Sequence, residues 1–148
     1  MNGTDDGMAA MEAAARAAIA YRQAVAEAER TPVADYARML AAFAGQTPEA
    51  GAEGAAIIDE LVRLATPGIR AMTGTRFFGW VIGGSHPTGV AADWLTAAWG
   101  QNAGNLVASP AAAAVEAVAS DWLLDLLGLP ATASVGFVTG ATDRKSVV

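Results

Sequence analysis

Helix-forming residues dominate this chain of 148 residues, and its strand-like segments are few and short. Residues 8–30 are rich in Ala, Glu and Arg and nearly free of helix breakers, which predicts a helix with a thin apolar face. Thr31-Pro32 is a helix-start signal that predicts a second helix to about Phe43, and residues 55–65 predict a third. Helices with so narrow an apolar face are suited to packing on a larger body.

Two further helices have clear start and stop signals. Ser85-His86-Pro87 opens one of them, over residues 87–99, and Gly100 ends it.

The last helix is opened by Ser109, the predicted N-cap, and Pro110, and it is closed by Gly128 and Pro130. Its apolar residues recur at helical spacing and predict a buried face: Ala111, Val115, Val118, Trp122 and Leu126.

Strand composition is confined to two places. Residues 76–84, "RFFGWVIGG", predict a partly buried extended segment, and Val135–Val138 predict a short buried strand. A parallel or mixed sheet needs several strands and their crossovers. We therefore expect the chain by itself to fold marginally and to expose apolar surface.

Composition excludes several classes of function. The net charge of −6 and the lack of a basic stripe argue against a nucleic-acid partner. The chain has no cysteine, which excludes disulfides and thiolate metal sites. No basic segment precedes an apolar run at the N-terminus, as a secretory signal would require. Residues 94–115 are uncharged but carry polar residues and a proline, so we expect no membrane span and a soluble, cytoplasmic protein.

The strongest chemical signal is the turn "TGAT" at residues 139–142. Its small residues would let backbone N–H groups approach a phosphate, and Thr139 and Thr142 would add hydroxyls. The pattern alone favours a plain strand–turn–helix corner, because such corners select Gly and Thr for their geometry.

The other reactive residues predict structural roles. His86 is the only histidine and is expected to bond its own backbone at a helix start, so no metal constellation forms. Asp121 and Asp125 lie one helical turn apart and are expected to be solvated. The four tryptophans are expected in the core: Trp80, Trp94, Trp99 and Trp122.

Three segments match a known family in order and spacing: "RFFGWVIGGSHPTGVAADWLTAAW" (76–99), "ASPAAAAVEAVASDWLLDLLGLP" (108–130) and "GFVTGAT" (136–142). They resemble the pyridoxal-phosphate-dependent group II amino-acid decarboxylases, which act on aromatic amino acids, glutamate or tyrosine. The resemblance implies an α/β enzyme of fold type I, cytoplasmic and homodimeric, that decarboxylates an L-amino acid. It implies three parts: a helical arm (1–75) wrapped on the dimer partner, the start of the cofactor-binding large domain (76–142), and a tail (143–148).

The resemblance also implies the site. Gly140, Ala141 and Thr142 would bind the phosphate of pyridoxal 5′-phosphate. The substrate would be lined by Trp80, Gly83, Asn102 and Asn105, the last two from a loop lent to the neighbouring subunit. Ile82-Gly83 stand where aromatic-amino-acid decarboxylases have Pro-Thr, so their substrate preference does not carry over.

The family's catalytic lysine, aspartate and histidine all follow the phosphate turn, beyond residue 142. Lys145 is the only lysine here and comes too early, which predicts a chain that is inactive alone. The codons GAT-CGG-AAG-AGC-GTC-GTG, which reproduce a common sequencing-adapter string, would encode "DRKSVV". We therefore expect residues 1–142 to be a native N-terminal fragment and residues 143–148 a translated adapter.

Two alternatives remain open at this stage. One is another fold-type-I lyase or aldolase that uses the same cofactor, because the phosphate turn is shared across such enzymes. The other is a non-catalytic helical interaction module that happens to contain a Gly/Thr turn.

Overall fold

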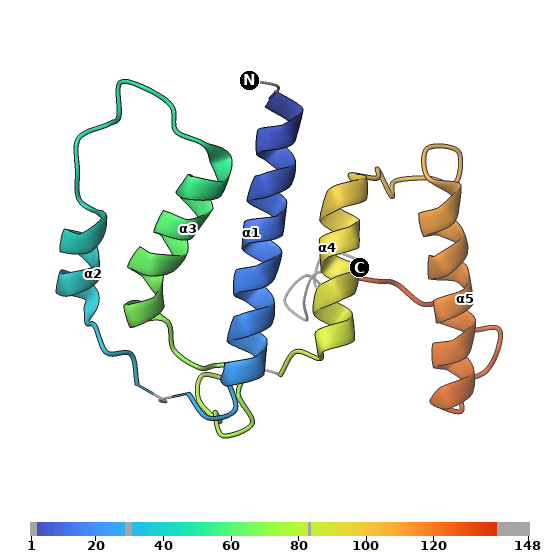
Figure 1. Ribbon diagram of the computed structural model, residues 1–148. Coiled ribbons are helices and arrows are strands. Elements are labelled where there is room, and N and C mark those ends of the chain that lie inside the picture. The colour runs from blue at the N-terminus through green and yellow to red at the C-terminus, as the bar shows by residue number, and fades with distance from the viewer. Residues whose placement is uncertain (1–2, 29–30, 83, 139–148) are drawn as a thin grey trace. The chain divides into compact units, whose positions relative to one another are not determined.

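The computed structural model describes residues 3–28, 31–82 and 84–138 (Figure 1). Within these ranges the chain forms five α-helices and one 3-10 turn, and no strand. The chain divides into two compact units, residues 1–91 and 92–148. Each unit is described below by itself. The prediction of a mostly helical chain is confirmed.

The first unit is organised around α1 (Gly3–Ala24), which lies along α3 (Gly54–Ala65) (Figure 1). Ala13 is almost fully buried, with 2% of its surface exposed. A Cβ on Gly54 would come within 3.1 Å of the Ala10 Cβ, so the small residues permit the close approach of the helices. α1 begins and ends earlier than predicted, and just beyond its end the chain turns and buries Val25.

The second helix starts later than its sequence signal suggested. α2 spans Tyr36–Phe43 and is capped by Asp35, whose Oδ1 accepts the Arg38 backbone N–H at 2.9 Å. The prediction of Thr31 as N-cap is therefore wrong. Ala34 is buried, and its N–H donates to the Pro67 carbonyl at 2.8 Å, which holds the chain before Asp35 out of the helix.

A short 3-10 turn, η1 (Thr66–Gly68), follows α3 and packs with it against α2. Gly68 packs closely against Met39, because a Cβ at position 68 would lie 2.6 Å from the Met39 sulfur and the Met39 side chain would have to move. The helix predicted at residues 55–65 is confirmed to within one residue, because α3 spans Gly54–Ala65.

Helix α4 (Pro87–Trp99) crosses the boundary between the units, and α5 (Pro110–Leu126) lies within the second unit. Both sets of predicted boundaries are confirmed. Gly100 and Gly128, at φ 56° and 64°, are the left-handed residues that end the two helices.

Ser109 is the N-cap residue of α5, as predicted, but its side chain makes no capping hydrogen bond. Its Oγ instead lies 3.4 Å from the Gln101 Oε1, and the residue is 1% exposed. The N-cap position was predicted correctly, but the capping hydrogen bond expected of Ser109 is not formed.

The strand predictions are wrong for the described residues. Residues 76–82 form a loop in which Trp80 and Val81 adopt positive φ values of 59° and 54°, and residues 135–138 have no strand partner. An isolated extended segment cannot satisfy its backbone donors and acceptors by pairing. The described chain thus lacks the one or two short strands expected for it.

The predicted core is also wrong. The buried apolar residues in the described chain are Ala13, Val25, Ala34, Ala71 and Leu124. The four tryptophans are 41–73% exposed, and the α5 residues Val115, Val118 and Leu126 are exposed as well. Asp121 and Asp125 are exposed as predicted. The apolar stripe of α5 has the periodicity of a buried face, but no described residue covers it.

None of the helices in the described part of the chain has the length and apolar character needed to cross a membrane. The polar interruption of residues 94–115 corresponds to the connection between α4 and α5.

Candidate functional site

The predicted site residues fall into three groups. Trp80 lies in the first unit, on the loop between η1 and α4. Asn102 and Asn105 lie in the second unit, between α4 and α5. The remaining four lie outside the described residues: Gly83, Gly140, Ala141 and Thr142. The tail, residues 143–148, lies outside them as well.

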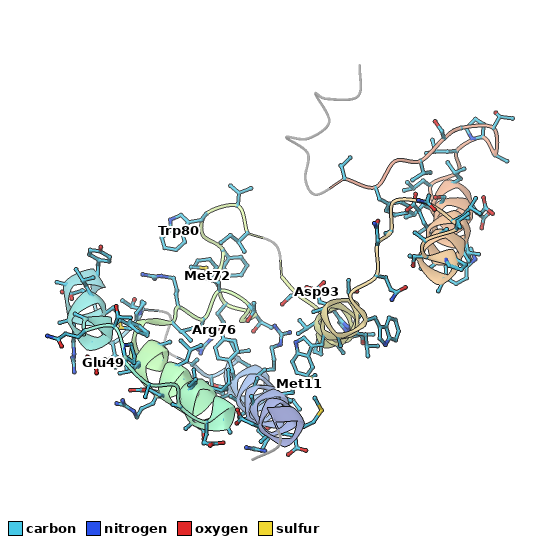
Figure 2. The ribbon with its side chains drawn as sticks, turned by 90° about the horizontal axis from the view of Figure 1, so that it is seen from above. Met11, Glu49, Met72, Arg76, Trp80 and Asp93 are labelled. Atoms are coloured by element: carbon cyan, nitrogen blue, oxygen red, sulfur yellow. The ribbon has the colours of Figure 1, made fainter. Side chains whose placement is uncertain are left out.

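Trp80 stands on a loop that rises away from α1 and α3, with Arg76 nearer to these helices (Figure 2). Trp80 is 66% exposed, and two side chains contact its ring. The edge of Phe77 meets it at a centroid distance of 5.8 Å and an interplanar angle of 62°. The Arg70 guanidinium carbon lies 5.1 Å from the centroid, in cation–π range. The indole therefore has a defined orientation although much of its surface is open.

The backbone under this indole is strained. Trp80 and Val81 are consecutive residues with left-handed φ, and a β-branched side chain is strongly disfavoured there. Each such residue costs roughly 1–2 kcal/mol. Strained backbone of this kind concentrates at functional sites.

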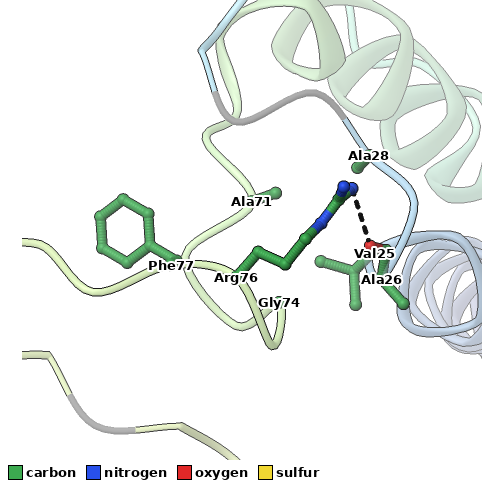
Figure 3. Close-up of a pocket in the computed structure, with 7 residues that line it drawn as sticks. All are labelled: Val25, Ala26, Ala28, Ala71, Gly74, Arg76 and Phe77. Atoms are coloured by element: carbon green, nitrogen blue, oxygen red, sulfur yellow. Dashed lines mark hydrogen bonds between the residues drawn. The ribbon is translucent and has the colours of Figure 1, made fainter.

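The base of the loop is fixed to the C-terminal end of α1. The Arg76 Nη2 donates to the Ala26 carbonyl at 3.0 Å (Figure 3). The Arg22 Nη1 donates to the Ser85 Oγ at 2.9 Å, and its Nη2 donates to the Ser85 carbonyl. Sequence reasoning missed these contacts. They join residues 50 to 63 positions apart, and no local pattern marks them.

A small hollow lies beside the Arg76 contact (Figure 3). Its volume is about 10 Å³, whereas ligand pockets usually have roughly 300–1,000 Å³. The hollow is too small to hold a cofactor, whether alone or together with an amino acid. The residues that line it are Val25, Ala26, Ala28, Ala71, Gly74, Arg76 and Phe77.

The two asparagines shape their own loop. The Asn102 Oδ1 accepts the Gly104 N–H at 3.0 Å. The Asn105 Oδ1 accepts both the Val107 N–H at 3.0 Å and the Ala108 N–H at 2.9 Å. The lone pairs of the Asn105 oxygen are thereby used, so this side chain can offer a ligand only its N–H donors.

His86 behaves as predicted, because its Nδ1 accepts the Thr88 backbone N–H at 3.3 Å. No group of three or more potential metal ligands occurs among the residues that were placed.

Comparison with protein families gives the class. Residues 37–146, more than half of the chain, match the model of the pyridoxal-dependent decarboxylase conserved domain. The match places the chain among proteins whose cofactor is pyridoxal 5′-phosphate. More specifically, the chain belongs to the pyridoxal-dependent decarboxylase family. No curated protein and no solved structure matches the chain. The resemblance of residues 76–142 to this family is thereby confirmed.

The described residues do not by themselves fit this cofactor. The hollow beside Arg76 is too small for it, and the only lysine, Lys145, lies outside the described ranges. The residues expected to hold its phosphate, 140–142, lie outside them too. The described residues thus hold no complete cofactor site.

Proposed function

We propose that this chain is part of a carboxy-lyase that decarboxylates an L-amino acid. The observation that carries the proposal is the family match over residues 37–146. The three registered segments within residues 76–142 support the same assignment. The amino acid decarboxylated is not specified by these residues, because Ile82-Gly83 depart from the pattern of the aromatic-amino-acid enzymes.

The roles proposed for the residues of this chain are binding and orientation. The bond-breaking chemistry belongs to the cofactor. Backbone N–H groups of Gly140 and Ala141 and the Thr142 hydroxyl would bind its phosphate. Trp80 would supply a flat apolar wall for the substrate, and Gly83 would leave space beside it.

Asn102 and Asn105 would line the substrate site of the neighbouring subunit. Because the Asn105 oxygen is already bonded within its loop, we expect Asn105 to act as a hydrogen-bond donor. A substrate carboxylate is an acceptor that such a donor would suit.

The proposed enzyme has an α/β fold of type I, forms a homodimer and is cytoplasmic. Residues 1–75 would be its helical arm and residues 76–142 the start of its large domain. The catalytic lysine, aspartate and histidine would follow residue 142, so we propose that the 148-residue chain alone is inactive. The exposed apolar stripe of α5 and the exposed tryptophans support a chain that packs against further structure.

The test is carbon dioxide release by the full-length gene product from a panel of L-amino acids, with and without added pyridoxal 5′-phosphate. We expect release from at least one amino acid, and none from the 148-residue chain. Conversion of amino acids without carbon dioxide would favour the alternative of another lyase or aldolase. A full-length product with no cofactor absorbance and a stably bound protein partner would favour a helical interaction module.

The phosphate turn gives a sharper prediction. Thr142→Val removes one hydroxyl at nearly constant volume, and a hydrogen bond to a charged group is worth about 1.5–3 kcal/mol. We expect cofactor affinity of the full-length product to fall about 10- to 100-fold in an absorbance titration. Thr96→Val is the matched control, because the Thr96 hydroxyl bonds the Ala92 carbonyl within its own helix. Equal affinity for the wild type and Thr142→Val would contradict the assigned turn.

A further inference from the structure

The loop of residues 76–85 is attached to α1 at both of its ends. Arg76 bonds the Ala26 carbonyl, and Ser85 receives the two bonds from Arg22. Arg22 and Ala26 are close in sequence, so both ends of the loop converge on the last turn of α1 and the residues just after it. Trp80 lies between these attachment points.

Arg22 is well suited to hold its end of the loop. Its guanidinium is planar and presents its donors in a fixed fork, and here both terminal nitrogens bond one residue, Ser85. The side chain is half-buried, and its Nε is buried without a hydrogen-bond partner among the described residues. A lysine has a single ammonium on a flexible stem and could not reproduce the same pair of bonds.

The loop between the attachment points needs such support. Trp80 and Val81 are strained, and Val81 is fully exposed, with 106% of its reference surface open to solvent. Burial of Val81 therefore does not offset the strain in the described structure. A strained conformation persists only where the surroundings determine it. Here the surroundings are the two fixed ends and the contacts of the Trp80 ring with Phe77 and Arg70.

α1 lies outside the region that matches the family model, which begins at residue 37. A residue outside the conserved domain thus holds a loop inside it. We propose that Arg22 is a positioning residue for substrate binding: through Ser85 it sets the conformation of the loop that carries Trp80. The inference rests on the proposed function, in which Trp80 lines the substrate.

The consequence for the reaction is specific. Trp80 would contact the substrate in the ground state and in the transition state alike, so loosening its loop removes uniform binding. Loss of uniform binding raises KM and leaves kcat nearly unchanged. A residue needed only for overall folding would instead lower the amount of active enzyme, and with it the apparent kcat, at unchanged KM.

The experiment uses the full-length gene product and the variants Arg22→Met, Arg22→Lys and Ser85→Ala. For Arg22→Met we expect KM for the best amino acid to rise about tenfold or more, with kcat within about threefold. Hydrogen exchange of residues 74–85, followed by mass spectrometry, should become about 10- to 100-fold faster. Arg22→Lys should behave similarly, and Ser85→Ala should show a smaller effect because it keeps the bond to the Ser85 carbonyl.

The matched control is Arg16→Met on the same helix, because Arg16 is exposed and pairs only loosely with Glu12, at 3.9 Å. It should change neither KM nor the exchange of residues 74–85. Unchanged exchange or unchanged KM in a folded Arg22→Met enzyme would overturn the proposal. If Arg22→Met does not fold, Ser85→Ala decides by the same two measurements. A wild-type product that acts on no amino acid, with exchange still faster in Arg22→Met, would refute the proposed function and leave the attachment of the loop to α1 established.

Discussion

The two units of the chain are held by different kinds of interaction. In the first unit, side chains bridge distant parts of the sequence: Asp6 to Gly54, Arg22 to Ser85 and Arg76 to Ala26. In the described part of the second unit, every hydrogen bond joins residues at most eight positions apart. The first unit therefore has a tertiary structure of its own, whereas the second has helices and turns that are bonded locally.

Burial shows the same contrast. The first unit buries Ala13, Val25, Ala34 and Ala71, and the described second unit buries only Leu124 among its apolar residues. Alanine contributes little, because a buried methyl group is worth roughly 0.8 kcal/mol. Most of the stability of a helix in a protein comes from packing of its apolar face, and the apolar residues Val115, Trp122 and Leu126 of α5 are exposed. The comparison indicates that the second unit depends on a covering surface much more than the first does.

The largest expected effect tests this comparison directly. In the 148-residue chain, we expect amide protons of α1 and α3 to exchange at least about 100-fold more slowly than those of α5. α5 should exchange within about tenfold of the rate of an unstructured peptide. Hydrogen exchange followed by mass spectrometry measures both. Equal protection of the two regions, with one sharp unfolding transition by circular dichroism, would show that the second unit is stabilised within the chain.

The sequence predicts the local features of this fold and misses those that depend on contacts between distant residues. The ends of α4 and α5 were predicted because a glycine in left-handed conformation is a local signal, as at Gly100 and Gly128. The start of α2 was missed because Thr31 and Asp35 are both acceptable caps, and the contact of Ala34 with Pro67 decides between them. A contact between residues so far apart in the sequence produces no pattern in the residues next to either of them.

The candidate site divides in the same way. Trp80, Asn102 and Asn105 are predicted site residues that come from resemblance to a family, and a family pattern records the result of long-range constraints. Resemblance did not reveal that the Asn105 oxygen is used within its own loop or that Arg22 holds Ser85. The strand predicted at residues 135–138 is absent for a physical reason, since strand composition yields a strand only where a partner strand exists.

A second prediction tests how far the packing of α1 on α3 distinguishes the first unit from the second, by placing a larger side chain in this contact. Ala13→Leu adds volume at a position that is 2% exposed, and overpacking typically costs about 1–3 kcal/mol. We expect the free energy of unfolding of the first unit to fall by this amount, measured by exchange of α1 amides. Ala14→Leu is the matched control on the same helix, because Ala14 is exposed, and it should change stability by less than about 0.5 kcal/mol. Equal effects of the two variants would mean that α1 does not pack on α3 through Ala13.

The smallest expected effect concerns the N-terminal cap of α3, which a side chain of α1 supplies. The Asp6 Oδ1 on α1 accepts the N–H of Gly54, the first residue of α3, at 2.6 Å, and the N-cap residue Glu53 makes no side-chain capping bond. Asp6 thus caps α3 from a distance of 48 positions in sequence. Asp6→Ala should cost about 1 kcal/mol, as loss of a local cap does. Asp6→Asn keeps an acceptor oxygen and should lose less. Glu12→Ala is the control, since Glu12 is exposed and forms only a loose pair with Arg16. If Asp6→Ala destabilised the chain no more than Glu12→Ala, the bridge from α1 to α3 would not contribute to stability, and the contrast between the units would depend on the bonds of Arg22 and Arg76 alone.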